Sequence, residues 1–124
     1  ISLVDTLDNR SLSIYRTLTS HFDDTQKQAV NDELGKQATL FVANQVAANF
    51  IGQANAPEFS KILEKVQERG VNMKNVDMSS FLTSTVNSLQ AELSTGKTTP
   101  GMYQFFNQFQ TTYAQGYSPL DVTI

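Results

Sequence analysis

The chain has 124 residues and a formal net charge of −3, and this length predicts a single domain covering residues 1–124. It contains no cysteine, which excludes disulfides, thiolate metal sites and cysteine nucleophiles. Its few Lys and Arg residues are scattered, so we expect no nucleic-acid partner, because binding to phosphates requires clustered cations.

The first predicted helix covers about residues 6–21. Asp5 or Thr6 is expected to cap it, because a short side-chain oxygen can accept from the unpaired N–H groups of the first turn. Its apolar residues recur every three or four positions, the spacing of one helical face. They are Val4, Leu7, Ile14, Leu18 and Phe22.

The second predicted helix, from about residue 25 to residue 52, is the longest and is expected to lie at the centre of the fold. Thr25 and Gln28 have the spacing of a capping box. We interpret Gly35 as a place where a neighbouring helix passes close, since it otherwise costs about 1 kcal/mol relative to alanine. The apolar series is Val30, Leu34, Ala38, Phe41, Val42, Val46, Ala47, Phe50 and Ile51.

The third predicted helix is short. Pro57 is expected at its first position, where the fixed φ of proline suits a helix. Gly70 is expected to end it in a left-handed conformation. The following residues 71–77 alternate between apolar and polar side chains. We interpret them as an extended loop over the core, because an isolated strand would lack partners for its backbone groups.

The fourth predicted helix starts with Asp77 or Ser79 as its cap and runs to about Gly96. The fifth has Thr99 as its cap and Pro100 at its first position, and it ends at Gly116. An irregular tail follows from residue 117, and we expect its apolar residues to lie on the surface of the bundle or to fray. The predicted fold is therefore all-α, with about five helices.

Side chains able to perform catalysis are few. The only histidine is His21, which stands near Asp23 and Asp24 at a predicted helix junction. A hydrolytic site built on these residues is one hypothesis, but the interaction of a histidine with the end of a helix is the more ordinary explanation. The carboxylate pair Glu64 and Glu68 lies on a charged face beside lysines. We therefore predict no enzymatic activity, no catalytic residues, no metal site and no cofactor.

Large rings are more abundant than a core of this size needs, particularly near the middle and the end of the chain. We predict that some of them line a cavity between helices and bind a hydrophobic ligand such as a fatty acid. The alternative is that the same rings form a docking face of a protein interaction module, such as a secreted effector, antigen or assembly subunit. The predicted binding residues are Phe41, Phe50, Phe81, Phe106, Phe109 and Tyr113.

The composition also bears on where the protein works. Charged residues make up 17% of the chain, compared with about 25% in ordinary domains, and Gln, Asn, Ser and Thr supply much of its polarity. This pattern predicts a secreted or extracellular surface protein. The sequon at Asn9 would then permit glycosylation. No apolar run is long enough to span a membrane, and the sequence leaves the oligomeric state open.

Overall fold

The computed structural model describes residues 2–116, and within them it contains only helices. The all-α prediction with a long second helix is confirmed. Two short 3₁₀ turns, η1 and η2, accompany the five α-helices. In chain order the elements are η1 (Leu3–Thr6), α1 (Asn9–Leu18), α2 (Asp24–Ala48), α3 (Phe59–Arg69), η2 (Met73–Asn75), α4 (Met78–Ser94) and α5 (Pro100–Ala114). The predicted tail lies outside the described residues.

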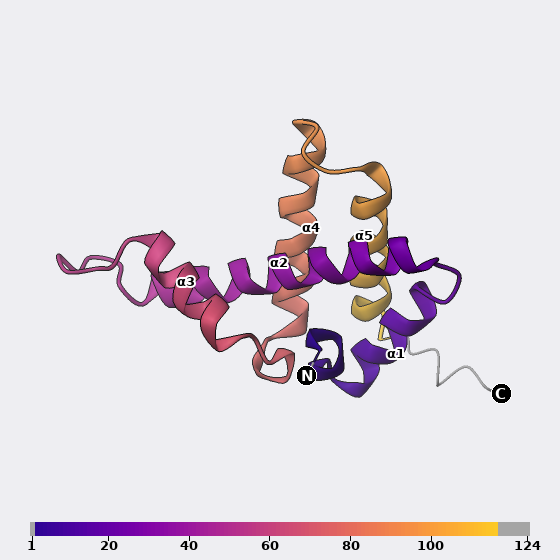
Figure 1. Cartoon of the computed structure of the whole chain (residues 1–124), viewed down its shortest axis with the longest axis horizontal. Coiled ribbons are helices and arrows are strands. Elements are labelled where there is room, and N and C mark those ends of the chain that lie inside the picture. The colour runs from indigo at the N-terminus through magenta and orange to yellow at the C-terminus, as the bar shows by residue number, and fades with distance from the viewer. Residues whose placement is uncertain (1, 117–124) are drawn as a thin grey trace.

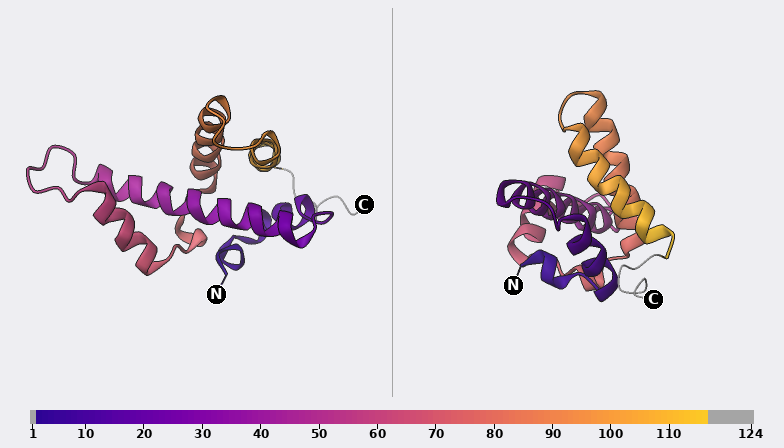
Figure 2. Two further views of the ribbon diagram at one scale, coloured as in Figure 1. Left: turned by 45° about the horizontal axis from the view of Figure 1, so that its top comes forward. Right: turned by 90° about the vertical axis from the view of Figure 1, so that its right-hand side faces the viewer.

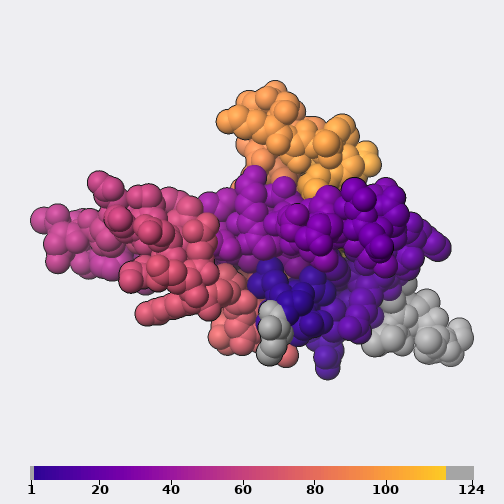
Figure 3. Space-filling view, viewed as in Figure 1, coloured from indigo at the N-terminus to yellow at the C-terminus, as the bar shows by residue number. Residues whose placement is uncertain are grey.

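Helix α2 is the axis along which the other helices are arranged. Figure 1 shows α4 and α5 side by side and steeply crossing α2, while α1 lies near the N-terminal half of α2. Helix α3 folds back along the other end of α2, as the left view in Figure 2 shows. The space-filling view shows that the α2–α3 end extends well beyond α4 and α5 (Figure 3). The two ends of α2 therefore have different neighbours.

The N-terminus of α1 differs from the prediction. Neither Asp5 nor Thr6 is its cap, because both belong to η1. The carboxylate of Asp8 caps the helix by accepting from the backbone N–H of Ser11 at 2.8 Å. The helix also ends at Leu18, before the predicted end at His21, and the hydroxyl of Thr19 donates to the carbonyl of Tyr15 at 2.9 Å.

The start of α2 corrects a second prediction. The capping box is formed by Asp23 and Gln26, with hydrogen bonds of 2.8 and 3.0 Å, and not by Thr25 and Gln28. The close-approach interpretation of Gly35 is also wrong. A Cβ atom there would lie 3.9 Å from Cδ2 of Leu3, which is an ordinary van der Waals contact.

The start of α3 lies later than predicted. The helix begins at Phe59 with Glu58 as its cap, so Pro57 precedes the helix and does not occupy its first position. Gly70 ends α3 at a φ of 73°, as expected for a glycine stop. Its ψ of 169° is extended, so the residue lies outside the left-handed helical region itself.

The caps of the last two helices follow the prediction. Asp77 caps α4 by accepting from the N–H of Ser80 at 3.1 Å. Thr99 caps α5 by accepting from the N–H of Met102 at 3.2 Å, with Pro100 at the first helical position. These two caps fix where α4 and α5 begin.

The main core lies where α1, α4 and α5 meet α2. Phe81, Phe106 and Phe109 have no exposed surface there. Phe105 and Phe106 meet edge to face with their ring centroids 5.1 Å apart. The segment predicted as an extended loop does cover the core, because Met73 is 1% exposed and its backbone N–H donates to the hydroxyl of Thr6 at 2.9 Å. Its middle is not extended, however, since residues Met73–Asn75 form the 3₁₀ turn η2.

A second, smaller apolar cluster joins α3 to the C-terminal half of α2. Its buried members are Ala43, Ile62 and Val66. Half-buried side chains around it include Val46 and Phe50. The single helix α2 thus contributes to both clusters, with Leu34 and Ala38 in the main core and Ala43 in the smaller one.

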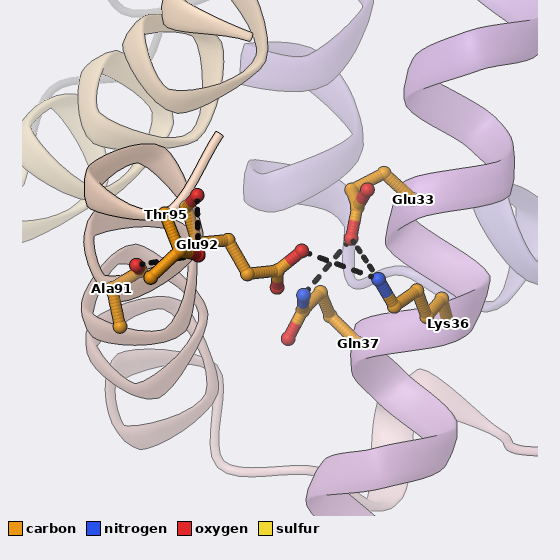
Figure 4. Close-up of polar contacts among 6 residues, drawn as sticks. All are labelled: Glu33, Lys36, Gln37, Ala91, Glu92 and Thr95. Carbon is orange, nitrogen blue, oxygen red and sulfur yellow. Dashed lines mark hydrogen bonds and ion pairs between the residues drawn. The ribbon is translucent and has the colours of Figure 1, made fainter. Parts of the chain in front are cut away.

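A polar network links α2 to α4 beside the main core (Figure 4). The ammonium of Lys36 lies 3.4 Å from Glu92 on α4 and 3.9 Å from Glu33. Gln37, which is 4% exposed, donates to the Glu33 carboxylate at 2.9 Å. The network gives the buried amide of Gln37 a hydrogen-bond acceptor, and it links α2 to α4 where the two helices cross.

Candidate functional site

Three of the six predicted binding residues lie inside the main core. Phe81, Phe106 and Phe109 are completely buried, and Phe41 packs edge to face on Phe81 with a centroid distance of 5.7 Å. Because the three buried rings contact protein on all sides, a ligand would reach them only by displacing core side chains. Phe41 is half-buried at the edge of this core. The ring surplus inferred from the sequence is used here for mutual packing.

Tyr113 lies at a different place, where α1 meets the C-terminal end of α5. The guanidinium carbon of Arg10 lies 4.2 Å from the centroid of the Tyr113 ring. Arg10 also donates a hydrogen bond to the carbonyl oxygen of Tyr113. The contact pairs a cation with an aromatic face and joins the two helices.

Asn9, the predicted glycosylation residue, is the first residue of α1 and is exposed. Ser11, which completes the sequon, is fully buried and its hydroxyl donates to Asp8 at 3.1 Å. Glycosylation stays a prediction, and the burial of Ser11 means that the modification would have to precede folding.

Phe50 is the predicted residue that lies at a surface groove. The groove runs between α3 and the C-terminal half of α2 and has a volume of about 560 Å³. Its apolar floor and charged rim come from α2, α3 and the loop between them. The floor is formed by Val46, Phe50, Pro57, Ile62 and Val66, and the rim by Lys61, Glu64, Lys65, Glu68 and Arg69.

The local sequence explains why this groove stays open. Helix α3 is only 11 residues long, and it buries Ile62 and Val66 against α2. The charged residues of α3 face solvent, so no further helix covers this flank. The run from Gln37 to Pro57 contains no charged residue, and the floor of the groove is therefore apolar without any buried charge.

Two apolar side chains project from the same end of the molecule. Ile51, directly after Phe50, is 82% exposed, and Phe59 is 39% exposed. An isolated exposed apolar residue is ordinary, but these two lie close in sequence to an apolar groove. This end of the molecule therefore presents the more hydrophobic surface to solvent.

A second groove lies between α2 and the start of α5 and has a volume of about 440 Å³. Phe22, Met102 and Phe105 contribute to it. The rest of its lining mixes apolar and polar residues, which are Leu18, Ala29, Val30, Gly101, Thr99, Gln26, Gln104 and Gln108. This mixed lining makes it a poorer match for an apolar chain than the α2–α3 groove.

The side chains considered for catalysis show no assembled site. His21 is exposed in the turn after α1, and the carboxylate of Asp23 is engaged in the capping box. Within residues 2–116 no group of three or more His, Asp or Glu side chains could hold a metal ion. Burial raises the pKa of Tyr15 to about 12, so its phenol stays protonated and donates to the side-chain oxygen of Asn31.

The floor residues Val46, Ile62 and Val66 were not among the predicted binding residues. Their apolar spacing is that of core positions, but the sequence does contain one indication of a surface site in this region. Phe50 and Ile51 are two adjacent apolar residues immediately before the turn at Gly52. Residues at the end of a helix that faced only the core would not both be apolar. Such a pair at a helix end indicates apolar surface near a chain reversal.

No helix within residues 2–116 combines the length and the apolar character needed to cross a membrane. Comparisons of the chain with known protein families, with curated proteins and with solved structures find no match.

Proposed function

We propose that this protein is a non-catalytic carrier or receptor for a hydrophobic ligand with an extended apolar chain, which lies in the α2–α3 groove. The observation that supports the proposal is an apolar floor with a charged rim, separate from a filled main core. Its volume of about 560 Å³ falls within the range of roughly 300–1,000 Å³ common among ligand sites.

The proposal places the ligand away from most of the residues predicted from the sequence. Phe50 belongs to the proposed site, whereas Phe81, Phe106 and Phe109 support the fold. The apolar chain would cover the half-buried side chains of Val46 and Phe50. Burial of such surface contributes about 25 cal/mol per Å², which supplies the main driving force.

The composition supports a location outside the cell or on its surface. A surface whose polarity comes largely from amides and hydroxyls is compatible with a carrier that meets its ligand in extracellular fluid. Detection of the protein in the medium around its source cells would support this part of the proposal, and retention inside the cell would oppose it.

The substitution Val46→Asn tests the site. It places an amide on the groove floor, where a bound chain would remove it from water without a partner, so we expect affinity to fall about fivefold or more. The measurement is titration with a fluorescent fatty-acid probe, with saturation as the criterion for a discrete site.

The matched control is Ala48→Asn, which makes the same amide in the last turn of α2 at an exposed residue outside the groove lining. This control should leave probe affinity unchanged. Equal losses in both variants, or no saturable binding to the unmodified protein, would contradict the proposed function.

The second candidate function is a protein interaction module, favoured by the 82% exposure of Ile51. In this case the tip of the α2–α3 end would insert into an apolar pocket of another protein chain. If that chain is a second copy, the mass in sedimentation will rise with concentration, and Ile51→Ser will abolish the rise. Lys27→Ser, at an exposed site near the other end of α2, is the control. Association that persists in the Ile51 variant would count against this candidate.

A further inference from the structure

The charges on the rim of the α2–α3 groove are arranged in order. Lys61, Lys65 and Arg69 recur at every fourth residue of α3, and all three line the groove. Residues of an α-helix are about 100° apart, so each step of four turns the side chain by about 40°. Over the length of α3 this drift moves the cationic stripe from the solvent face toward the apolar floor.

Arg69 is the cation closest in direction to that floor. Arg69 lies seven residues after Ile62, which corresponds to a rotation of about 700° around the helix axis. Their side chains therefore leave the helix in directions only about 20° apart. Ile62 is 5% exposed at the floor, whereas Arg69 is exposed at the end of α3. The guanidinium can therefore reach over the end of the groove while the rest of its side chain follows the groove wall.

The two acidic residues of the rim are engaged with the lysines. The ammonium of Lys61 lies 3.6 Å from the carboxylate of Glu64, and that of Lys65 lies 4.0 Å from the carboxylate of Glu68. Arg69, in contrast, has no acidic partner within 4 Å in the part of the chain that the structure describes. Its positive charge interacts favourably with the negative end of the α3 dipole. This interaction does not occupy the N–H donors of the guanidinium.

We propose, on the basis of the function proposed above, that the ligand is a long-chain carboxylate whose head group binds Arg69. Its alkyl chain lies along Val46, Phe50 and Ile62, and its carboxylate receives two parallel hydrogen bonds from the planar guanidinium. One cation without an acidic partner matches one negative charge, which favours a fatty-acid carboxylate over a doubly charged phosphate monoester.

The experiment measures displacement of a neutral fluorescent probe from the full chain by three ligands of equal chain length. These are laurate, methyl laurate and dodecylamine, each used below the concentration at which it forms micelles. We expect laurate to bind roughly three- to tenfold more tightly than its methyl ester, with dodecylamine the weakest. The preference for laurate should diminish in 1 M salt, where charges more than about 3 Å apart are screened.

The variant Arg69→Gln should abolish the preference for laurate while leaving the affinity for methyl laurate unchanged. Arg16→Gln is its matched control, because Arg16 is also an exposed arginine in the last turn of a helix, α1, and lies outside the groove. This control should keep the full preference. Circular dichroism of each variant verifies that the total helix content is unchanged.

The possible failures are distinguishable. If laurate and methyl laurate bind equally, or if Arg69→Gln keeps the preference, the head-group proposal is wrong while the groove remains a site for apolar chains. If no ligand displaces the probe because the probe itself does not bind saturably, the proposed function fails. Displacement by an acidic amphipathic peptide but not by laurate would overturn the carboxylate proposal in favour of a protein partner.

Discussion

Replacing Phe106 by alanine is expected to lower the free energy of unfolding by about 3–5 kcal/mol. The ring is completely buried, and it packs edge to face on Phe105 in the main core. Truncation removes its apolar contacts and leaves a cavity that the surrounding helices can only partly close. Urea unfolding followed by circular dichroism measures the change.

Phe59→Ala is the control for this loss. It removes the same ring from a position that is 39% exposed, and the expected loss is less than about 1 kcal/mol. The folded fraction of the Phe106 variant should bind the fatty-acid probe with unchanged affinity, because Phe106 lies outside the α2–α3 groove. A small loss of stability together with lost probe binding would instead assign Phe106 to the ligand site.

Ile62→Ala is expected to free α3 from α2 without unfolding the remaining helices. The small cluster of Ala43, Ile62 and Val66 holds α3, and α3 packs chiefly against α2. The truncation should weaken this docking by about 2–4 kcal/mol. Hydrogen exchange should therefore accelerate at the amides of α3, while those of α4 and α5 keep their protection.

Leu82→Ala is the comparison for this experiment, because Leu82 is fully buried in the main core. It should accelerate exchange across α2, α4 and α5 together. If Ile62→Ala accelerates exchange uniformly along the chain, the two clusters unfold as one cooperative unit and the expectation is wrong. Probe binding should also weaken in the Ile62 variant, since α3 forms one wall of the groove.

The helices could be predicted because their signals are local. Thr99 followed by Pro100 has one structural interpretation, and at the start of α4 the choice was between Asp77 and Ser79. The caps of α1 and α2 were harder, because several short polar residues stand within three positions of each other at both places. Spacing alone allows Asp5, Thr6 or Asp8 to cap α1, and the hydrogen bond from Ser11 decides between them only in three dimensions.

The candidate site was less accessible to sequence reasoning. A count of aromatic residues does not reveal whether rings leave space between them. That depends on whether side chains from distant segments meet edge to face, as Phe41 does with Phe81. The groove floor, for its part, consists of residues whose spacing is that of a buried helix face. Val46 becomes partly accessible because α3 is too short and too charged to cover it completely.

Helix α2 runs without interruption through both apolar clusters. It therefore fixes the distance and the rotation about the helix axis between the groove and the main core. One residue removed between Ala38 and Ala43 would turn everything beyond it by about 100° and shorten the separation by about 1.5 Å. Ala43 would then point away from α3. The floor residues on α2 would no longer face those on α3, although none of them had been substituted. The length of the turn between α2 and α3 does not affect how α2 is rotated against the main core. Insertions and deletions should therefore be tolerated far better in this turn than within α2.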